Sequence, residues 1–471
     1  MFLPRFLAHD PARRALHIDD TWFTYGELRA RGERIAGMLA SQGVHPGDVV
    51  AIHLDNGLDL VDAHLGCMAL GAIRLPLNAH YREAELRPIV EDASPVLVFT
   101  SAPERFPGLA CFAPTDPRAE LLWPSHDLTA LLFTSGTTGR PKGVPQTFTM
   151  WEANLDALSQ LWGLTAEDHL WLALPLFHTH GLVLGLHGTL LRGASARLEA
   201  RFEPVPPPTG ITHVYGVPTW YRRWLPGMQA DPEPFTRLRL MVSGSDGLDL
   251  ATSNAVFDAT GHRILERYGM TETVMICSNP GEGERRAGTV GPPVPGVEVR
   301  LVDGEVQVRG PSVFGGYLEP GQPLRVAGRR CADTAAAAPA WFSTGDAGAW
   351  DHAGYLRIVG RKKELIIVGG VNVSPAEVEA VFADMPGVAE AGVCGLPDAD
   401  LSEVVGLAVV LAPGAWEAAV RDAIIQRGQD LSGLKRPRRV ICVPDLPRNA
   451  LGKLQRSRLR RLFDEAKESD P

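Results

Sequence analysis

The pattern that most restricts the fold is an alternation of strand-like and helix-like segments through the first two-thirds of the chain. Residues 49–54 form an apolar run typical of a buried strand, residues 58–70 have a helical pattern, and residues 96–100 resemble another short strand. Thr24 and Glu27 have the spacing of a capping box in front of a helix. This alternation predicts an α/β body rather than an all-helical or all-β one.

The pattern changes in the last third of the chain. From about Gly304, short β-prone pieces predict a small β-rich lobe, and beyond Arg361 the chain has a compact α+β pattern. A chain of 471 residues is too long for one ordinary core. We therefore predict an N-terminal core, residues 1–362, made of two α/β subdomains and the β-rich lobe. A small mobile α+β domain, residues 363–471, is expected to follow.

Composition excludes several classes of function. Lys and Arg number 46 and Asp and Glu 55, so the net charge of −9 provides no general attraction to nucleic acid or to an anionic membrane. Apolar runs are interrupted well before the roughly 20 residues that a membrane-spanning helix needs, so no membrane insertion is expected. The 6 cysteines are scattered, and the N-terminal residues lack the apolar core of a signal peptide. A cytoplasmic location is therefore expected.

An apolar strand runs into a loop that is rich in glycine and small hydroxyl residues. The strand, residues 131–133, precedes the string Thr134-Ser135-Gly136-Thr137-Thr138-Gly139-Arg140-Pro141-Lys142-Gly143. Backbone N–H groups, hydroxyls and one lysine suit a polyphosphate. The string is not a Walker A loop, because its lysine follows a proline and precedes a glycine. We interpret it as a phosphate loop, the alternative being a flexible surface turn.

Five further strings follow in order along the chain. They are YGMTE at 268–272, STGD at 343–346, GRKKE at 360–364, GGVNV at 369–373 and PRNALGK at 447–453. Together with the phosphate loop they make nearly the whole chain resemble the adenylate-forming superfamily of acyl-CoA synthetases, adenylation domains and luciferases. The resemblance implies an acid–thiol ligase that uses ATP and Mg²⁺ to form an acyl-adenylate and release pyrophosphate. Coenzyme A would then accept the acyl group as a thioester, with release of AMP.

The resemblance also implies roles for individual residues. Attack of a carboxylate on the α-phosphate of ATP brings negative groups together, so cations and oriented donors are needed. The implied catalytic residues are Lys453, Glu272, Thr271 and Lys142, with Glu272 as the Mg²⁺ ligand. The implied nucleotide- and CoA-binding residues are Thr134, Ser135, Gly136, Thr137, Thr138, Lys142, Gly244, Ser245, Asp246, Tyr268, Gly269, Thr271, Asp346, Arg361 and Gly370.

Two lysines of the C-terminal region have distinct implied roles. Lys363 lies at the position of the hinge about which the C-terminal domain would alternate between the two half-reactions. Lys453 lies in a Gly-Lys turn, and its flexible ammonium could reach both the carboxylate and the α-phosphate. Because acylation would remove this charge, a lysine acetyltransferase and a deacetylase acting on Lys453 are potential partners.

Several strings resemble malonyl-CoA synthetases more closely than ligases of fatty or aryl acids. They are residues 174–182, 216–222, 266–272, 278–280 and 286–291. A buried distal carboxylate needs a cation or dense hydrogen bonding, and Arg222 and Arg286 are candidates for that cation, although either could make a structural salt bridge instead. His178 is expected as a pocket wall or hydrogen-bond donor, and Met270 as a further substrate contact.

Malonate is therefore the expected acid, with malonyl-CoA as the product. Within the same reaction, methylmalonate or another small carboxylic acid is the alternative substrate. A different alternative is a stand-alone adenylating module that loads the thiol of a carrier protein. A degenerate nucleotide-binding regulator is a third alternative, against which the retention of Lys142, Glu272, Asp346 and Lys453 argues.

Overall fold

The computed structural model describes residues 2–107, 109–112, 127–134, 141–318, 340–369, 371–448 and 454–468. The chain packs into two compact units. Unit 1 comprises Met1–Val299 and Val308–Phe342, and unit 2 comprises Arg300–Gln307 and Ser343–Pro471. The domain boundary expected at Lys363 stays a prediction.

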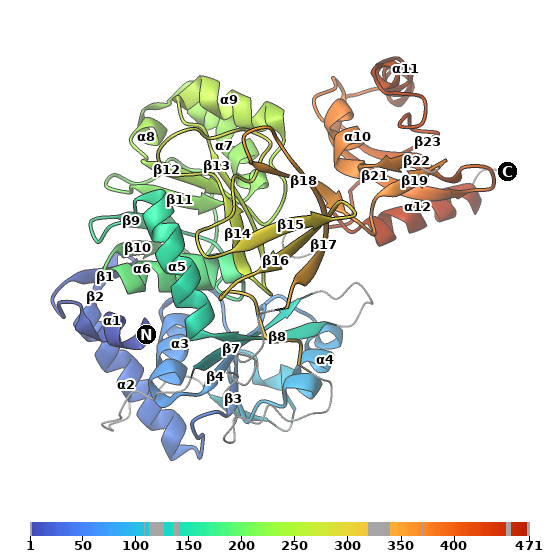
Figure 1. Ribbon diagram of the computed structural model, residues 1–471. Coiled ribbons are helices and arrows are strands. Elements are labelled where there is room, and N and C mark those ends of the chain that lie inside the picture. Colours follow the sequence, from blue (N-terminus) through green and yellow to red (C-terminus); the bar gives the residue numbers. More distant parts are fainter. Residues whose placement is uncertain are drawn as a thin grey trace. The chain divides into compact units, whose positions relative to one another are not determined.

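The larger sheet of unit 1 has eight strands in the order β14-β13-β12-β11-β9-β10-β1-β2 (Figure 1). Its strands are β1 (Arg14–Ile18), β2 (Thr21–Thr24), β9 (His169–Leu172), β10 (Ser195–Leu198), β11 (His213–Gly216), β12 (Leu240–Ser243), β13 (Leu265–Met270) and β14 (Val274–Ser278). Neighbours from β13 to β1 are parallel, whereas β2 and β14 are antiparallel edge strands. The carboxyl ends of β9, β11, β12 and β13 therefore share one edge, where α/β sheets place their ligands.

The second sheet of unit 1 has six strands in the order β6-β5-β3-β4-β7-β8. Its strands are β3 (Val49–His53), β4 (Ile73–Pro76), β5 (Leu97–Thr100), β6 (Ala110–Phe112), β7 (Leu128–Thr134) and β8 (Lys142–Thr147). Only the β7–β8 pair is antiparallel among the strand pairs of this sheet in the described residues. The strands expected at 49–54 and 96–100 are confirmed as β3 and β5.

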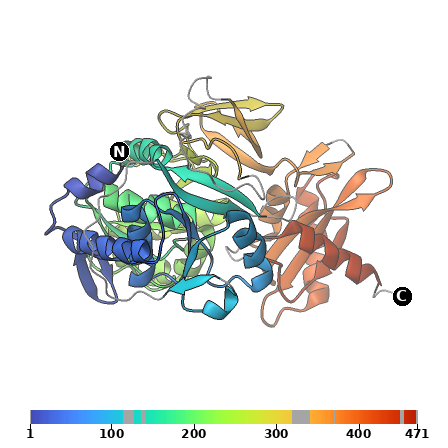
Figure 2. The same ribbon diagram turned by 90° about the horizontal axis from the view of Figure 1, so that it is seen from below.

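Helices cover both sheets of unit 1. They are α1 (Phe2–Ala8), α2 (Tyr25–Ser41), α3 (Leu58–Leu70), α4 (Glu83–Ala93), η1 (Pro103–Arg105), α5 (Phe148–Trp162), the π-helix η2 (His180–His187), α6 (Gly188–Arg192), α7 (Pro218–Ala230), α8 (Glu233–Thr236) and α9 (Leu250–Thr260). The helix expected at 58–70 is confirmed as α3, and the capping box of Thr24 and Glu27 begins α2. Helices α2 and α3 pack closely, since a Cβ on Gly66 would lie 2.2 Å from the side chain of Ile35. The N-terminal helix α1 lies beside α5, to which Arg5 and Asp156 tie it (Figure 2).

A small sheet follows in the order β15-β16-β17-β18. Its strands are β15 (Glu298–Val302), β16 (Glu305–Arg309), β17 (Phe342–Trp350) and β18 (Leu356–Arg361). The expected β-prone pieces after Gly304 are confirmed as β16 and β18. Most residues of this sheet belong to unit 2.

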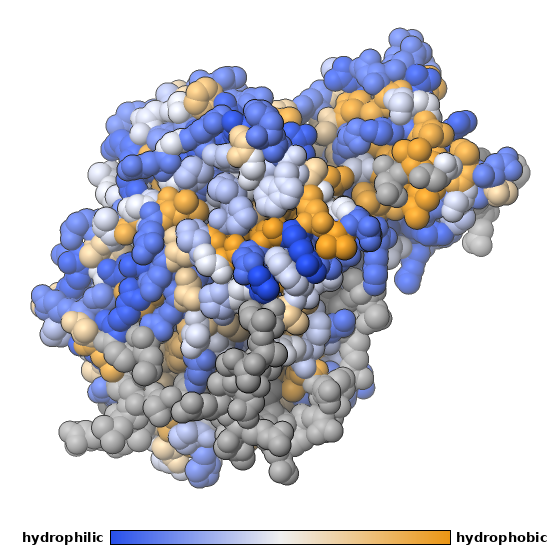
Figure 3. Space-filling view, in the orientation of Figure 1, coloured by the Kyte–Doolittle hydropathy of each residue, from blue (hydrophilic) through white to orange (hydrophobic). Residues whose placement is uncertain are grey.

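The other sheet of unit 2 has the order β20-β19-β22-β21, with β23 paired to β22. Its strands are β19 (Ile366–Val368), β20 (Val371–Val373), β21 (Val388–Asp398), β22 (Ser402–Leu411) and β23 (Arg439–Cys442), and the helices of this unit are α10 (Pro375–Phe382), α11 (Glu417–Arg427), η4 (Gly428–Asp430) and α12 (Arg456–Glu468). The predicted α+β pattern is confirmed. Phe382 and Phe463 are fully buried on α10 and α12. Figure 3 shows apolar surface over this sheet, whose exposed side chains include Ile367 and Val371.

These units confirm the predicted α/β class. Among the residues that the structure describes, no helix combines the length and apolar character needed to cross a membrane.

Candidate active site

The phosphate loop connects two paired strands. Thr134 ends β7, Lys142 begins β8, and the two residues are direct partners in the antiparallel ladder. This pairing fixes both ends of the loop at one point of the six-stranded sheet. Ser135, Gly136, Thr137 and Thr138, which the sequence predicts to bind phosphate, lie outside the described residues.

Tyr317 contacts two charged side chains with predicted roles, Lys142 in binding phosphate and Glu272 in binding the metal. The ammonium of Lys142 lies 4.8 Å from the centroid of the Tyr317 ring, in cation–π contact. The hydroxyl of Tyr317 donates a hydrogen bond of 2.8 Å to the carboxylate of Glu272. Tyr317 was not predicted from the sequence. The one pattern that could have indicated it is an aromatic residue directly after two glycines, Gly315 and Gly316.

Glu272 fits the role of a Mg²⁺ ligand. Its side chain is buried, so an ionised carboxylate there needs a hydrogen bond or a cation. Mg²⁺ is usually bound by one or two carboxylates together with substrate phosphates, rather than by a cage of protein ligands. The described residues contain no cluster of three or more His, Cys, Asp or Glu that could hold a metal.

The YGMTE string forms the end of β13 and a bulged turn into β14. The register shifts between Tyr268 and Gly269, and a Cβ on Gly269 would lie 1.9 Å from the carbonyl oxygen of Val274. Only glycine can therefore occupy that position. The backbone oxygen of Thr271 accepts a hydrogen bond from the side chain of Gln146 on β8. This bond ties the YGMTE turn to the strand that follows the phosphate loop.

The loop after β12 reaches the same edge of the larger sheet. Ser245 has a left-handed backbone with φ 71°, and its hydroxyl lies 3.3 Å from Nδ1 of His180. Gly244 lies directly against the side chain of Arg267, while Asp246 is exposed. The structure thus brings the loop after β12 together with β13 and with the segment after β9.

The residues predicted to bind the acid lie in different surroundings. Nε2 of His178 is buried and makes no hydrogen bond within the described part of the chain, and burial lowers the pKa of His178 to about 4. Met270 is half-buried at the end of β13. Arg222 lies on α7 and pairs with Asp249 at 3.1 Å, and Arg286 pairs with Glu284 at 3.0 Å. Both arginines therefore have carboxylate partners, and their binding of substrate stays a prediction.

Glu266 is a buried acid at this edge that sequence reasoning did not single out. Its carboxylate accepts a hydrogen bond of 2.9 Å from the N–H of Gly288, in the loop that carries Arg286. Burial raises the pKa of Glu266 to about 7. The folded protein therefore holds this proton at a pH where the unfolded chain has lost it, so Glu266 lowers the stability progressively as the pH rises from about 4.5 through 7.

Replacing Glu266 with glutamine should stabilise the protein only at higher pH. The glutamine retains an oxygen for the N–H of Gly288 but has no charge to bury. We expect the melting temperature to rise by roughly 2–5 °C at pH 8 and to change little at pH 5. Thermal unfolding at both pH values measures this difference, and equal shifts at the two would contradict the assignment.

In unit 2, Asp346 and Arg361, two of the predicted nucleotide-binding residues, face each other across a strand pair. Asp346 on β17 is the register partner of Arg361 on β18, and Nε of Arg361 lies 2.9 Å from the carboxylate of Asp346. Arg361 also donates a hydrogen bond of 2.8 Å to the backbone oxygen of Thr344. This geometry orients a mostly buried carboxylate, which is the group needed to accept hydrogen bonds from two hydroxyls.

The remaining predicted residues of unit 2 lie in turns. Lys363 is exposed in the turn after β18, and Gly370 lies outside the described residues. Lys453 also lies outside them.

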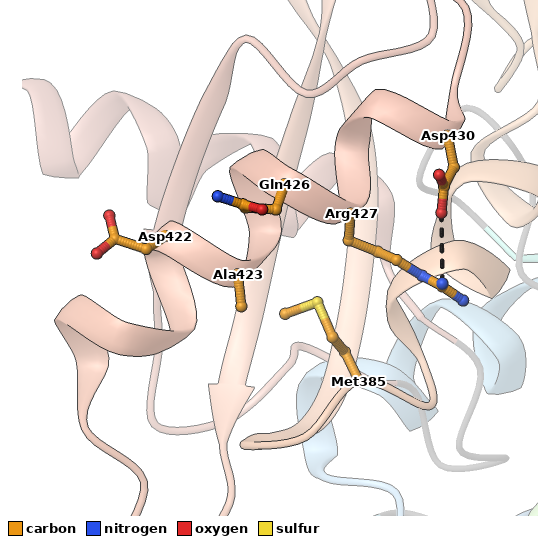
Figure 4. Close-up of a pocket in the computed structure, with 6 residues that line it drawn as sticks. All are labelled: Met385, Asp422, Ala423, Gln426, Arg427 and Asp430. Carbon is orange, nitrogen blue, oxygen red and sulfur yellow. Dashed lines mark ion pairs between the residues drawn. The ribbon is translucent and has the colours of Figure 1, made fainter.

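A shallow pocket beside α11 belongs to unit 2 as well (Figure 4). It is lined by Met385, Asp422, Ala423, Gln426, Arg427 and Asp430. Arg427 and Asp430 form an ion pair with each other at 3.3 Å. The pocket contains none of the residues that the sequence predicts for binding or catalysis, so we assign it no part in the reaction.

Comparison with known proteins identifies the family. The family model described as AMP-binding enzyme matches residues 3–318, and its C-terminal domain model matches residues 377–453. The oxalate–CoA ligase of Arabidopsis thaliana is 32% identical over 95% of this chain and 95% of its own length. The malonate–CoA ligase of the same plant is 30% identical over 96% of this chain and 86% of its own length.

A solved structure resembles this chain over almost its full length. The crystal structure of ATP-bound MatB from Rhodopseudomonas palustris superposes with a TM-score of 0.87 at 34% identity, covering 99% of both chains. The paired ends of the phosphate loop, the buried carboxylate of Glu272 and these matches lead to one conclusion: the chain belongs to the AMP-binding enzyme family and is an ATP-dependent acyl-CoA ligase of the adenylate-forming type.

Proposed function

We propose that the acid activated by this ligase is malonate. The enzyme would join malonate to the α-phosphate of ATP, release pyrophosphate, and then transfer the malonyl group from AMP to the thiol of coenzyme A. The relatives named for oxalate and malonate act on small dicarboxylic acids, which supports a small acid with two carboxylates. Methylmalonate remains the nearest alternative, because it differs from malonate by one methyl group.

The observation that carries the adenylation chemistry is the contact of Lys142 and Glu272 with the same tyrosine. The ring of Tyr317 makes a cation–π contact with the ammonium of Lys142, and its hydroxyl donates a hydrogen bond to the carboxylate of Glu272. These contacts keep both side chains near β8, the strand that follows the phosphate loop. In the proposed reaction Lys142 holds the β- and γ-phosphates as pyrophosphate leaves. Glu272 would hold Mg²⁺, which neutralises phosphate charge when bound, and Thr271 would bind the α-phosphate.

Residues of unit 2 have proposed roles in the same reaction. Asp346 would bind the ribose, Arg361 would bind the ribose or a phosphate, and Lys453 would stabilise the charge that develops between the acid and the α-phosphate. The phosphate loop residues Ser135 to Thr138 would add hydroxyl and N–H donors to the β- and γ-phosphates. Gly370 would line the path of the CoA thiol.

Exchange of labelled pyrophosphate into ATP tests the acid. Malonate, methylmalonate, oxalate, acetate and butyrate are compared without CoA, and the product mass is then measured with CoA present. We expect the highest kcat/KM with malonate and the mass of malonyl-CoA. A higher kcat/KM with a monocarboxylic acid would refute the malonate proposal, and exchange without any CoA thioester would favour a carrier-protein loader.

The hinge at Lys363 gives a separate prediction. Lys363→Pro should trap one orientation of the C-terminal domain, because proline holds φ near −65° and blocks the change of torsion that alternation requires. One half-reaction should then survive far better than the other in single-turnover assays. Lys363→Ala, which leaves the backbone free to rotate, is the matched control. Normal rates of both half-reactions in Lys363→Pro would show that the pivot lies elsewhere.

A further inference from the structure

Gln146 is a fully buried residue to which the proposed mechanism gives no task. It lies on β8, the strand that begins at Lys142. Its Nε2 donates a hydrogen bond to the backbone oxygen of Thr271 in the YGMTE turn, and its Oε1 accepts one of 2.7 Å from Nε1 of Trp151 on α5. The side chain therefore links the strand that follows the phosphate loop to the turn that carries Thr271 and Glu272.

The chemistry of its two partners fixes the orientation of the Gln146 amide. The indole N–H of Trp151 can only donate, so the amide presents its oxygen to that ring. The NH₂ group then faces the carbonyl of Thr271, which can only accept. An apolar side chain of the same length would leave a buried indole N–H and a backbone carbonyl without these hydrogen bonds, at a cost to the folded geometry.

Trp151 is itself held by a buried cation. Arg74 on β4 is fully buried, and its Cζ lies 5.1 Å from the centroid of the Trp151 ring, in cation–π contact. Burial lowers the pKa of Arg74 only to about 10, so the guanidinium keeps its charge at neutral pH. Among the described residues Arg74 makes no ion pair with a carboxylate. It donates instead to the backbone and hydroxyl oxygens of Thr129, and its Nη1 lies 2.7 Å from Nε2 of His187.

The partners of Arg74 belong to elements that lead into the site. Thr129 lies on β7, whose last residue, Thr134, starts the phosphate loop. His187 ends η2, and burial keeps the pKa of this histidine well below its usual range, so its neutral ring can accept from the guanidinium. One set of contacts therefore joins the strand before the phosphate loop to the YGMTE turn. In order, its members are Thr129, Arg74, Trp151, Gln146 and Thr271.

We propose that Gln146 is a positioning residue for adenylation, which holds the YGMTE turn in register with the phosphate loop, and that Trp151 and Arg74 hold Gln146 in place. The inference rests on the proposed roles of Thr271 at the α-phosphate and of the loop at the β- and γ-phosphates. It does not depend on which acid is activated.

The reaction itself explains why register matters. A carboxylate oxygen of the acid forms a bond to the α-phosphorus, while the bond from that phosphorus to the bridging oxygen breaks and pyrophosphate leaves with the electron pair. Thr271 and the phosphate loop would hold the two sides of the breaking bond. A displacement of about 1 Å between such groups can lower a rate a hundredfold.

Gln146→Met tests the positioning role, because it removes both hydrogen bonds and retains most of the volume. We expect kcat of pyrophosphate exchange to fall about thirtyfold, with KM for ATP and for the acid changed less than about threefold, since the register is needed mainly in the transition state. The acid used is the one that gives the fastest wild-type exchange.

Tyr25→Phe is the matched control. Tyr25 is also fully buried, and its hydroxyl donates a hydrogen bond of 2.8 Å to the backbone oxygen of Ala194. Its loss should lower the melting temperature, as the loss of Gln146 does, but should leave kcat unchanged. The comparison separates the positioning of the YGMTE turn from the general cost of a missing buried hydrogen bond.

A double-mutant cycle tests the link through Trp151. Trp151→Phe removes the N–H that orients the amide and leaves an aromatic ring beside Arg74, so kcat should fall about fivefold. If Trp151 acts through Gln146, the double variant should lose no more than Gln146→Met alone. Additive losses would overturn the link between the two residues.

The outcomes separate the inference from the proposed function. A kcat of Gln146→Met within about twofold of wild type would overturn the positioning role, as would a rise in KM without a fall in kcat. Thr271→Val removes the hydroxyl proposed for the α-phosphate but keeps the backbone oxygen that Gln146 binds, so wild-type exchange in that variant would refute the proposed role of Thr271 instead. If Gln146→Met does not fold, kcat of Trp151→Phe decides, and an unchanged value would overturn the inference.

Discussion

Lys453→Ala is expected to abolish the adenylation half-reaction and to leave thioester formation from pre-formed acyl-adenylate largely intact. The ammonium is proposed to stabilise charge that develops only while the acid attacks the α-phosphate, so its loss affects the first transition state alone. We expect pyrophosphate exchange to fall by roughly a thousandfold, the upper range for loss of one such stabilising group. The second half-reaction is measured by adding CoA to synthetic acyl-adenylate.

The control for Lys453→Ala is a second lysine of unit 2. Lys435 pairs with Glu377, and Lys435→Ala should retain both half-reactions. Acetylation of Lys453 should also silence adenylation, because it removes the charge. Equal loss of both half-reactions in Lys453→Ala would contradict the role, and so would full activity of uniformly acetylated enzyme.

Glu272→Gln is expected to reduce pyrophosphate exchange by about 10²–10³-fold. Glutamine retains the size of the side chain and can still accept the hydrogen bond from Tyr317, but it lacks the charge that Mg²⁺ requires. The concentration of Mg²⁺ that gives half-maximal exchange should therefore rise. A titration of exchange rate against Mg²⁺ measures both effects.

Tyr317→Phe distinguishes a metal ligand from a structural carboxylate. It removes the hydroxyl that donates to Glu272 while the carboxylate and the ring beside Lys142 remain. The loss should be no more than about tenfold, the usual effect of one hydrogen bond to a charged group. If Tyr317→Phe and Glu272→Gln lower exchange equally, without any change in Mg²⁺ dependence, Glu272 acts by holding Tyr317 in place.

Local patterns predicted the elements of this protein well. The helix at 58–70 and the capping box of Thr24 and Glu27 depend on residues within one or two turns of each other, so their signals are complete in the sequence. The position of Glu272 could likewise be predicted, because its motif is a continuous string. The predicted residues Ser135 to Thr138, Gly370 and Lys453 lie outside the described part of the chain, and their roles rest on the resemblance.

The sequence by itself determined the α/β class, the order of strands and helices, and the family to which the strings belong. Only the tertiary structure decided which distant side chains meet. Tyr317 contacts both Lys142 and Glu272, and Arg267 lies against Gly244 because β12 and β13 are parallel neighbours. Strand order differs from chain order, so such contacts leave no local pattern. Whether a buried charge such as that of Arg267 has a partner cannot be seen in the sequence. The free energy of burying the charge depends on the polar groups that all the neighbouring elements bring.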